Sequence, residues 1–198
     1  MFIQIKEKQK NNQNIKLKSH LHYLLKQKNK LENKSILFSN RNNRLINNNL
    51  INQTKTKKIN NEILKCLANY FIKEFNILTT KEKKLIFLKF FSLMNISKKN
   101  PNGFTVNTNS LLPIKKGFAV SIKDTQNCFN EIGLFKVIIY AMNNKNINAF
   151  GGWFNDENGK YYFDASLIFE KFEDALDYGK KNNQIAIFDL NECKEIRI

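Results

Sequence analysis

The sequence is poor in the residues that disulfide-bonded, metal-binding and membrane-spanning proteins require. Its 198 residues include 2 histidines, 3 cysteines, 2 prolines and 1 tryptophan. The cysteines (Cys66, Cys128 and Cys193) are widely spaced and odd in number, which argues against a disulfide framework or a zinc pattern. No apolar run approaches the roughly 20 residues of a membrane helix. Charge follows Met1–Ile5 at once, unlike in a signal peptide. The sequence therefore predicts a soluble, cytoplasmic protein with reduced thiols.

Candidate catalytic residues are equally scarce. Both histidines, His20 and His22, lie in a lysine-rich N-terminal segment, so the C-terminal half has no imidazole for general-base chemistry. Cys128 precedes an apolar helical pattern, but no histidine lies near it in sequence, which favours a buried thiol. Four carboxylates would form a metal site only if the fold gathered them: Asp124, Glu131, Asp164 and Asp189. We therefore expect no enzyme activity, no cofactor and no metal.

The net charge of +16 is concentrated in the first half of the chain. Residues 1–100 carry 22 Lys and Arg against 5 Asp and Glu, a net charge of +17. Residues 101–198 carry 11 against 12, a net charge of −1. A basic half joined to a neutral half predicts a region that binds polyanions and a domain that has another role.

Codon bias offers a simpler explanation for part of this charge. The chain has 30 Lys and 32 Asn but only 3 Arg, and the codons of Lys and Asn are rich in A and T. The same bias acts on the C-terminal half, which stays neutral. Codon bias can therefore explain part of the absolute charge, but it does not explain the asymmetry between the two halves.

The N-terminal half is predicted to be helical in two parts. Residues 1–60 read as a basic Asn/Lys-rich arm, with a helical pattern around Leu21–Leu31 and a linker or marginal helix over Asn40–Asn61. Residues 61–100 read as an amphipathic helical hairpin, whose second helix begins at a capping box formed by Thr79 and Glu82. The breaker Asn100-Pro101-Asn102-Gly103 predicts a domain boundary.

Residues 104–198 read as a compact α+β domain in the order β-α-β-β-α-β. Alternating apolar residues predict strands, apolar residues at helical spacing predict helices, and Asn158-Gly159 predicts a tight hairpin turn. The predicted elements are Gly117–Ile122, Phe129–Met142, Ala149–Asn155, Lys160–Phe169, Phe172–Lys181 and Gln184–Leu190, with Glu195–Ile198 returning as a hairpin. This order favours a ferredoxin-like split-βαβ sandwich, with an antiparallel sheet of different strand order as the alternative.

An aromatic cluster and a glycine pair mark the predicted hairpin. Alternation sends Tyr161 and Phe163 to one face and Tyr162 to the other, so part of the cluster belongs to the core. Base stacking on the open sheet face is the alternative, and the nearby acids disfavour phosphate there. Gly151-Gly152 precedes no helix, so a bulge or close packing under Trp153 is favoured over a phosphate loop.

The lysines of the basic half are the candidate nucleic-acid-binding residues. Their charges would neutralise phosphates and give salt-sensitive, sequence-independent affinity, while the shortage of arginine disfavours bidentate reading of guanine. A solvated, composition-biased face is the alternative interpretation. The candidates are Lys16, Lys18, Lys26, Lys28, Lys30, Arg41, Arg44, Lys55, Lys57 and Lys58.

Several runs of the C-terminal half carry a resemblance to a known group of proteins. The runs are Gly151–Phe154, Asn158–Asp164 and Ile185–Leu190, with Gly117–Val120 and Thr125–Asn127 upstream. This half resembles small uncharacterised proteins of phages and integrated mobile elements from Bacteroidetes-like bacteria. The resemblance supplies no active-site residues. It implies work on nucleic acid or on host machinery that attacks nucleic acid.

Three functions follow as hypotheses. The first is a non-enzymatic phage or mobile-element accessory protein that binds nucleic acid or a nucleoprotein complex through its basic half. The second is a protein–protein inhibitor or regulator of a host defence complex, of the anti-CRISPR or anti-restriction type. The third, a carboxylate-dependent nuclease, would require Mg²⁺-dependent cleavage that disappears on Asp164→Ala or Asp189→Ala.

Overall fold

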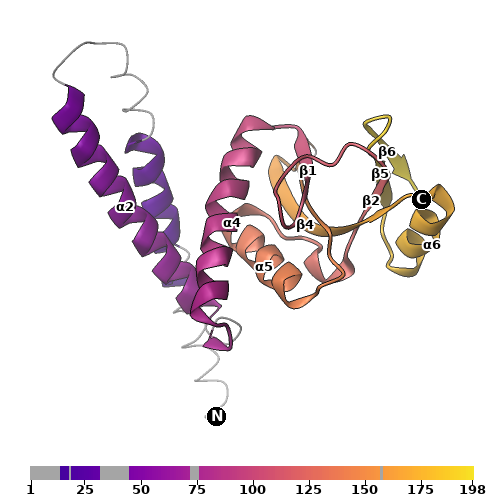
Figure 1. The fold of residues 1–198 in the computed structure, drawn as a ribbon, viewed down its shortest axis with the longest axis horizontal. Coiled ribbons are helices and arrows are strands. Elements are labelled where there is room, and N and C mark those ends of the chain that lie inside the picture. Colours follow the sequence, from indigo (N-terminus) through magenta and orange to yellow (C-terminus); the bar gives the residue numbers. More distant parts are fainter. Residues whose placement is uncertain (1–13, 18, 32–44, 72–75, 157) are drawn as a thin grey trace. The chain divides into compact units, whose positions relative to one another are not determined.

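The chain divides into two compact units, Met1–Ile77 and Leu78–Ile198. The computed structural model describes residues 14–17, 19–31, 45–71, 76–156 and 158–198 (Figure 1). The division falls more than twenty residues before the boundary predicted at Asn100–Gly103, because the helix preceding that breaker packs with the sheet. The two helices of the predicted hairpin thus belong to different units, and their pairing stays a prediction.

The N-terminal unit is helical in the described residues. Residues 14–17 and 19–31 are helical, which confirms the pattern around Leu21–Leu31. Helix α2 (Leu45–Tyr70) covers residues 45–61 of the stretch predicted as a linker or a marginal helix, and residues 40–44 lie outside the described residues. Asparagine costs less than about 0.7 kcal/mol per residue in a helix relative to alanine, too little to stop one that has an apolar face to bury.

The C-terminal unit begins with α4 (Thr80–Lys99), whose capping box is confirmed. The Glu82 N–H donates to Thr79 Oγ1 over 3.3 Å, and the Thr79 N–H donates to Glu82 Oε2 over 2.7 Å. Phe90 of α4 meets Phe135 of helix α5 (Asn130–Asn143) edge to face, with ring centroids 5.9 Å apart. Helix α4 is therefore part of the α+β unit.

One antiparallel sheet of six strands forms the rest of this unit. The strands are β1 (Gly103–Asn107), β2 (Phe118–Ser121), β3 (Ala149–Asn155), β4 (Lys160–Phe169), β5 (Ala186–Asp189) and β6 (Lys194–Arg197). Their order is β1-β3-β4-β2-β5-β6. A 3-10 turn, η1 (Lys123–Thr125), follows β2, and helix α6 (Phe172–Lys181) joins β4 to β5.

The predicted strands and helices of this unit are confirmed, with one omission. Strand β1 lies where the sequence predicted only a boundary, although Phe104 and Val106 alternate toward one face and Val106 is 2% exposed. The five residues of β1 begin at the last residue of the Asn100–Gly103 breaker and carry too short a pattern to distinguish a strand from a linker. The strand forms because it pairs along its whole length with β3, from Gly103 opposite Trp153 to Asn107 opposite Ala149.

Register divides the sheet into two faces, since directly paired residues point the same way. The helix face carries Phe163, Val120 and Ile187, and Val120 and Ile187 pack with Ala175 of α6. Right-handed crossovers from β2 to β3 and from β4 to β5 put α5 on this face as well. The opposite face, which we call the far face, carries Trp153, Tyr162 and Asp164.

Candidate nucleic-acid interface

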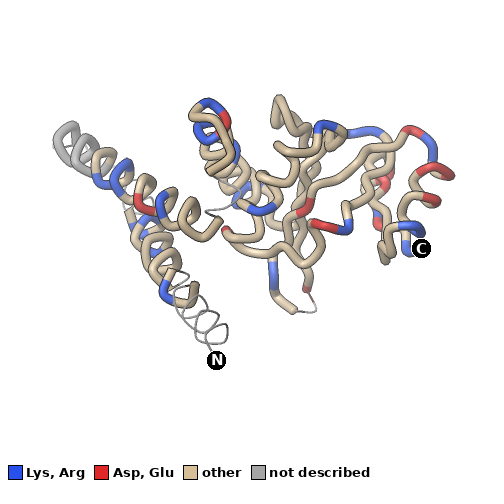
Figure 2. The backbone as a smooth tube through the Cα atoms, turned by 90° about the horizontal axis from the view of Figure 1, so that it is seen from below, with Lys and Arg blue, Asp and Glu red and all other residues tan. Residues whose placement is uncertain are grey.

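The structure describes seven of the ten predicted phosphate-binding residues, all of them on helices of the N-terminal unit. Lys18, Arg41 and Arg44 lie outside the described residues. Lys16 lies in the helical residues 14–17, Lys26, Lys28 and Lys30 lie in the helical residues 19–31, and Lys55, Lys57 and Lys58 lie on α2. Figure 2 shows basic positions recurring along both helices, with acidic ones rare among them.

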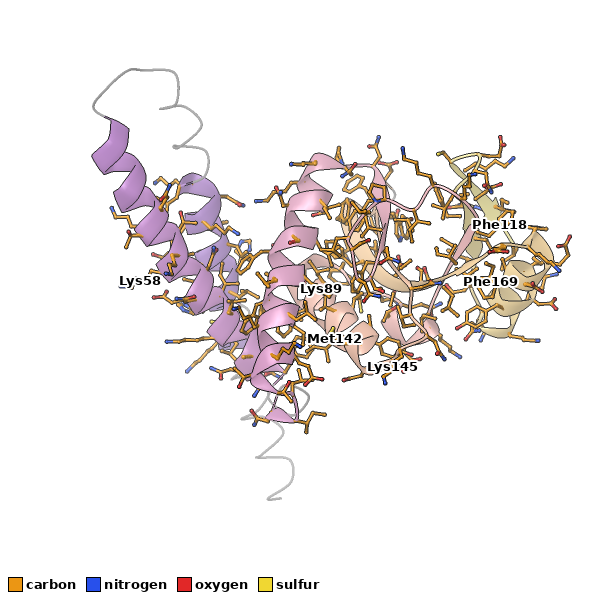
Figure 3. The ribbon with its side chains drawn as sticks, viewed as in Figure 1. Lys58, Lys89, Phe118, Met142, Lys145 and Phe169 are labelled. Atoms are coloured by element: carbon orange, nitrogen blue, oxygen red, sulfur yellow. The ribbon has the colours of Figure 1, made fainter. Side chains whose placement is uncertain are left out.

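The exposed side of α2 forms the clearest basic surface. Lys55, Lys58 and Lys65 follow one another at spacings of three and seven, which places them on one helix face. All three are exposed, whereas Ile63, which is 0% exposed, and Leu67 lie on the other side. Lys58, labelled in Figure 3, lies in the middle of this row. We call Lys55, Lys58 and Lys65 the α2 lysine row; sequence reasoning missed Lys65.

Lys28 does not belong with the exposed lysines. It follows Leu21 by seven residues and Leu24 by four, so it lies on the apolar face of its helix and is half-buried. Its alkyl stem continues that face, as long basic side chains commonly do. The helical pattern already placed Lys28 in line with these leucines, so the same signal argues against it as a phosphate ligand.

The basic charge is shared between the two units rather than confined to one. Residues 1–77 carry 16 Lys and Arg against 4 Asp and Glu, a net charge of +12. Residues 78–198 carry 17 against 13, a net charge of +4, and α4 alone contributes six lysines. The N-terminal unit is still the strongly basic one, and the charge per residue remains highest there.

One α4 lysine has a structural role. Lys89, labelled in Figure 3, is 5% exposed, and its ammonium donates to the backbone carbonyl of Thr108, at the end of β1. Desolvation lowers the pKa of Lys89 below its ordinary value. The side chain therefore ties α4 to the sheet and is not presented to a polyanion.

The aromatic residues of the hairpin separate onto the two faces as alternation predicted. Tyr161 and Phe163 gather with Phe104 on the helix face, where the Tyr161 hydroxyl donates to the Asn100 carbonyl over 2.9 Å. Burial raises the pKa of Tyr161 to about 12. Tyr162 and Trp153 stack on the far face with ring centroids 5.1 Å apart. Core packing therefore accounts for the first set but not for the second.

The glycine pair gives close packing without a bulge, since β3 and β4 stay in continuous register across it. A Cβ at Gly151 would lie 2.5 Å from Asp164 Oδ1. A Cβ at Gly152 would overlap the rings of Phe104 and Tyr161. The groups packed against the pair are thus Asp164 and these two rings, rather than Trp153.

Asp164 is a buried carboxylate held by hydroxyl groups. It is 8% exposed, accepts a hydrogen bond from Ser166 Oγ, and shares the far face with Ser121. Burial raises its pKa above the ordinary value, against the opposing effect of hydrogen bonds from Ser166 and Ser121. The folded protein thus binds a proton at the Asp164 carboxyl group more tightly than the unfolded chain does.

That raised pKa predicts a specific pH dependence. The stability contributed by protonated Asp164 is fully present below the unfolded pKa of 3.8 and is lost as pH rises through the folded pKa. Asp164→Asn removes this loss, so the stability of the variant relative to the natural chain should rise as pH increases above 3.8. Urea unfolding of both proteins at each pH measures the difference. A difference that is constant with pH would contradict the shift.

Three of the four carboxylates considered for a metal site are used in separate local structures, and the fourth, Glu131, lies in the first turn of α5. Asp124 accepts from the Tyr140 hydroxyl over 3.1 Å. Asp189 Oδ1 accepts from the N–H of Asn191 over 2.8 Å, forming a turn. Desolvation alone would raise the pKa of Asp189, but the hydrogen bonds that its carboxylate accepts in this turn outweigh desolvation and hold the pKa below its ordinary value. Across the described ranges, no three His, Cys, Asp or Glu side chains gather to hold a metal ion.

The two internal cysteines are buried thiols. Cys66 is 7% exposed and Cys128 is 4% exposed. Burial raises the pKa of both, which disfavours the reactive thiolate. Cys193 is exposed.

The chain has no match among protein families, curated proteins or solved structures. Of the helices that the structure describes, none is long and apolar enough to cross a membrane.

Proposed function

We propose that the protein is a non-enzymatic nucleic-acid-binding accessory protein that uses the helices of its basic N-terminal unit to contact the phosphate backbone. The observation that carries the proposal is the α2 lysine row, three exposed cations on one helix face in a unit of net charge +12. Within the described residues, no ion pair with a carboxylate is found for Lys55, Lys58 or Lys65. These ammonium groups are therefore available to phosphate.

The chemistry of these residues favours binding without sequence recognition. Lysine is a flexible point charge, whereas bidentate reading of guanine edges requires the planar fork of arginine. Helix α2 has 26 residues and is about 39 Å long, enough to follow several phosphates along a strand. Each neutralised phosphate releases counterions, so affinity should fall steeply as salt rises.

Removal of the α2 lysine row tests the proposal directly. In the triple variant Lys55→Gln/Lys58→Gln/Lys65→Gln, we expect weaker binding to a fluorescent oligonucleotide. The salt slope should become shallower by about two to three, or roughly one for each phosphate that is no longer neutralised. Fluorescence anisotropy between 50 and 300 mM salt measures both the affinity and the slope.

The matched control removes three exposed lysines of the C-terminal unit, Lys115, Lys116 and Lys145, by the same substitution. It should retain most of the affinity because the more basic unit is intact. An equal loss of affinity in both variants would mean that net charge alone determines binding. No binding by the natural chain at low salt would overturn the proposal.

The α+β unit would supply a protein-docking or dimer surface in addition to the basic unit. We propose that it is a ferredoxin-like split-βαβ sandwich extended by two edge strands. The four central strands run β3-β4-β2-β5, with α5 and α6 as crossover helices, while β1 and β6 extend the two edges. The resemblance of this half to phage and mobile-element proteins supports the same setting, a complex assembled on nucleic acid in a bacterial host.

Capture of partners after nuclease digestion separates this function from direct inhibition of a host defence protein. The proposed function predicts that partners are lost when the nucleic acid is digested. A host protein retained in stoichiometric amount would instead support the inhibitor hypothesis.

A further inference from the structure

A row of aromatic rings crosses the far face of the sheet. Trp153 of β3 and Tyr162 of β4 are directly paired, and their rings are nearly parallel, with an interplanar angle of 18°. Phe129 bridges to the other side of Tyr162 and meets its ring edge to face at 5.8 Å. The row therefore runs from Phe129 through Tyr162 to Trp153, and Trp153 lies at its end.

The outer ring face of Trp153 has no side chain opposite it in the sheet. The next strand, β1, places Gly103 beside Trp153. Gly103 has φ 148°, a conformation that L side chains rarely adopt, and a Cβ there would lie 2.8 Å from the Gly152 carbonyl oxygen. The backbone thus requires glycine at this position. Trp153 is 40% exposed, although a neighbouring ring covers its inner face.

A basic group lies at one end of this row. Lys160 is exposed, and its Nζ lies 4.4 Å from the centroid of the Phe129 ring.

The carboxylates near this row disfavour a bound phosphate less than the sequence suggested. Asp164 is buried against Gly151 and shielded by hydroxyl groups. Asp156 is exposed in the hairpin turn and remains an unfavourable charge. A ligand held mainly by ring stacking fits these surroundings better than one held by phosphate contacts alone.

We infer that Trp153 is a stacking platform for an unpaired base of single-stranded nucleic acid. A planar base would lie against the outer face of the indole, above Gly103, and extend the row of rings by one member. Such stacking accepts any base, because every base has a π-face. A base inside a duplex cannot stack on Trp153, because its two faces are already covered by the neighbouring base pairs. The inference rests on the proposed function and narrows its ligand to single strands.

Trp153 is the single tryptophan of the sequence, so its fluorescence is an intrinsic probe of this site. Titration of the full chain with a thymidine oligonucleotide should quench Trp153 fluorescence as a base stacks on the ring. A duplex of equal length should leave the emission unchanged. Trp153→Ala should weaken single-strand binding about 5- to 150-fold, which corresponds to 1–3 kcal/mol per stacked base. Trp153→Phe, which keeps a ring, should retain most of the affinity.

The outcomes separate this inference from the function on which it rests. Salt-sensitive binding seen by anisotropy, without quenching and with full affinity in Trp153→Ala, would overturn the stacking site and leave the proposed function standing. Equal quenching by the duplex would overturn the single-strand assignment. Quenching that persists in the triple variant of the α2 lysine row would support stacking while showing that those lysines contribute little. The natural protein's own fluorescence decides the question even if Trp153→Ala fails to fold.

Discussion

Replacing Phe90 by alanine should destabilise the α+β unit by about 3–5 kcal/mol, the range measured for large buried aromatic side chains. Phe90 is 0% exposed and meets Phe91 and Phe135 edge to face, at 5.3 and 5.9 Å between ring centroids. Removal of the ring would leave a cavity between α4 and α5 that neither helix backbone can close. Since a domain is stable by only about 5–15 kcal/mol, this cost would be a large part of the total.

Trp153 fluorescence makes this result a test of the domain boundary as well. The tryptophan lies on β3, so urea unfolding followed by its emission reports on the sheet. Phe90→Ala should shift that transition because α4 folds with the sheet. Lys84→Ala, an exposed change on the same helix, should shift it by less than about 0.5 kcal/mol. An unchanged transition in Phe90→Ala would return the boundary to Asn100–Gly103.

Replacing Gly151 by alanine should cost about 1–3 kcal/mol, the usual cost of overpacking a buried site. The added Cβ would lie 2.5 Å from Asp164 Oδ1 and 2.9 Å from the carboxyl carbon, and both residues are buried. The carboxylate cannot move away without losing the hydroxyl donor Ser166. The hairpin must therefore distort or leave a buried acid poorly satisfied.

A double-mutant cycle isolates this contact. In an Asp164→Ala background the carboxylate is gone, so the added cost of Gly151→Ala should fall by at least about 1 kcal/mol. Gly159→Ala is the matched control: its Cβ would meet nothing within 4 Å, and its cost comes from φ 64° alone. That cost should be the same in both backgrounds. Additive effects of Gly151→Ala and Asp164→Ala would show that the two groups do not touch.

Much of the local structure follows from short stretches of sequence. The ranges of β3, β4 and α6 are those predicted, because alternation, Asn158-Gly159 and helical spacing act within a few residues. The capping box at Thr79 is local for the same reason. Strand β1 was missed because its stability comes from pairing with β3, some fifty residues later, and its own five residues carry little signal.

The candidate site was predictable only in part. Exposed Lys55 and Lys58 follow from composition and helical spacing, whereas Lys28 and Lys89 are removed from the surface by packing against apolar or backbone groups. The partner of Gly151 could not be predicted, since Asp164 reaches it only through the register of β3 with β4. Gly103 beside Trp153 likewise depends on the register of an unpredicted strand.

The sequence by itself determined the uneven charge, the helices described in the N-terminal half and the order of the elements predicted in the α+β unit, because each depends on neighbouring residues. Only the tertiary structure decided that α4 belongs with the sheet, that β1 extends one edge, and that Trp153 lies 40% exposed beside Gly103. These features depend on contacts between residues far apart in the chain. Such contacts are selected by the shape and burial of the whole unit rather than by any local pattern.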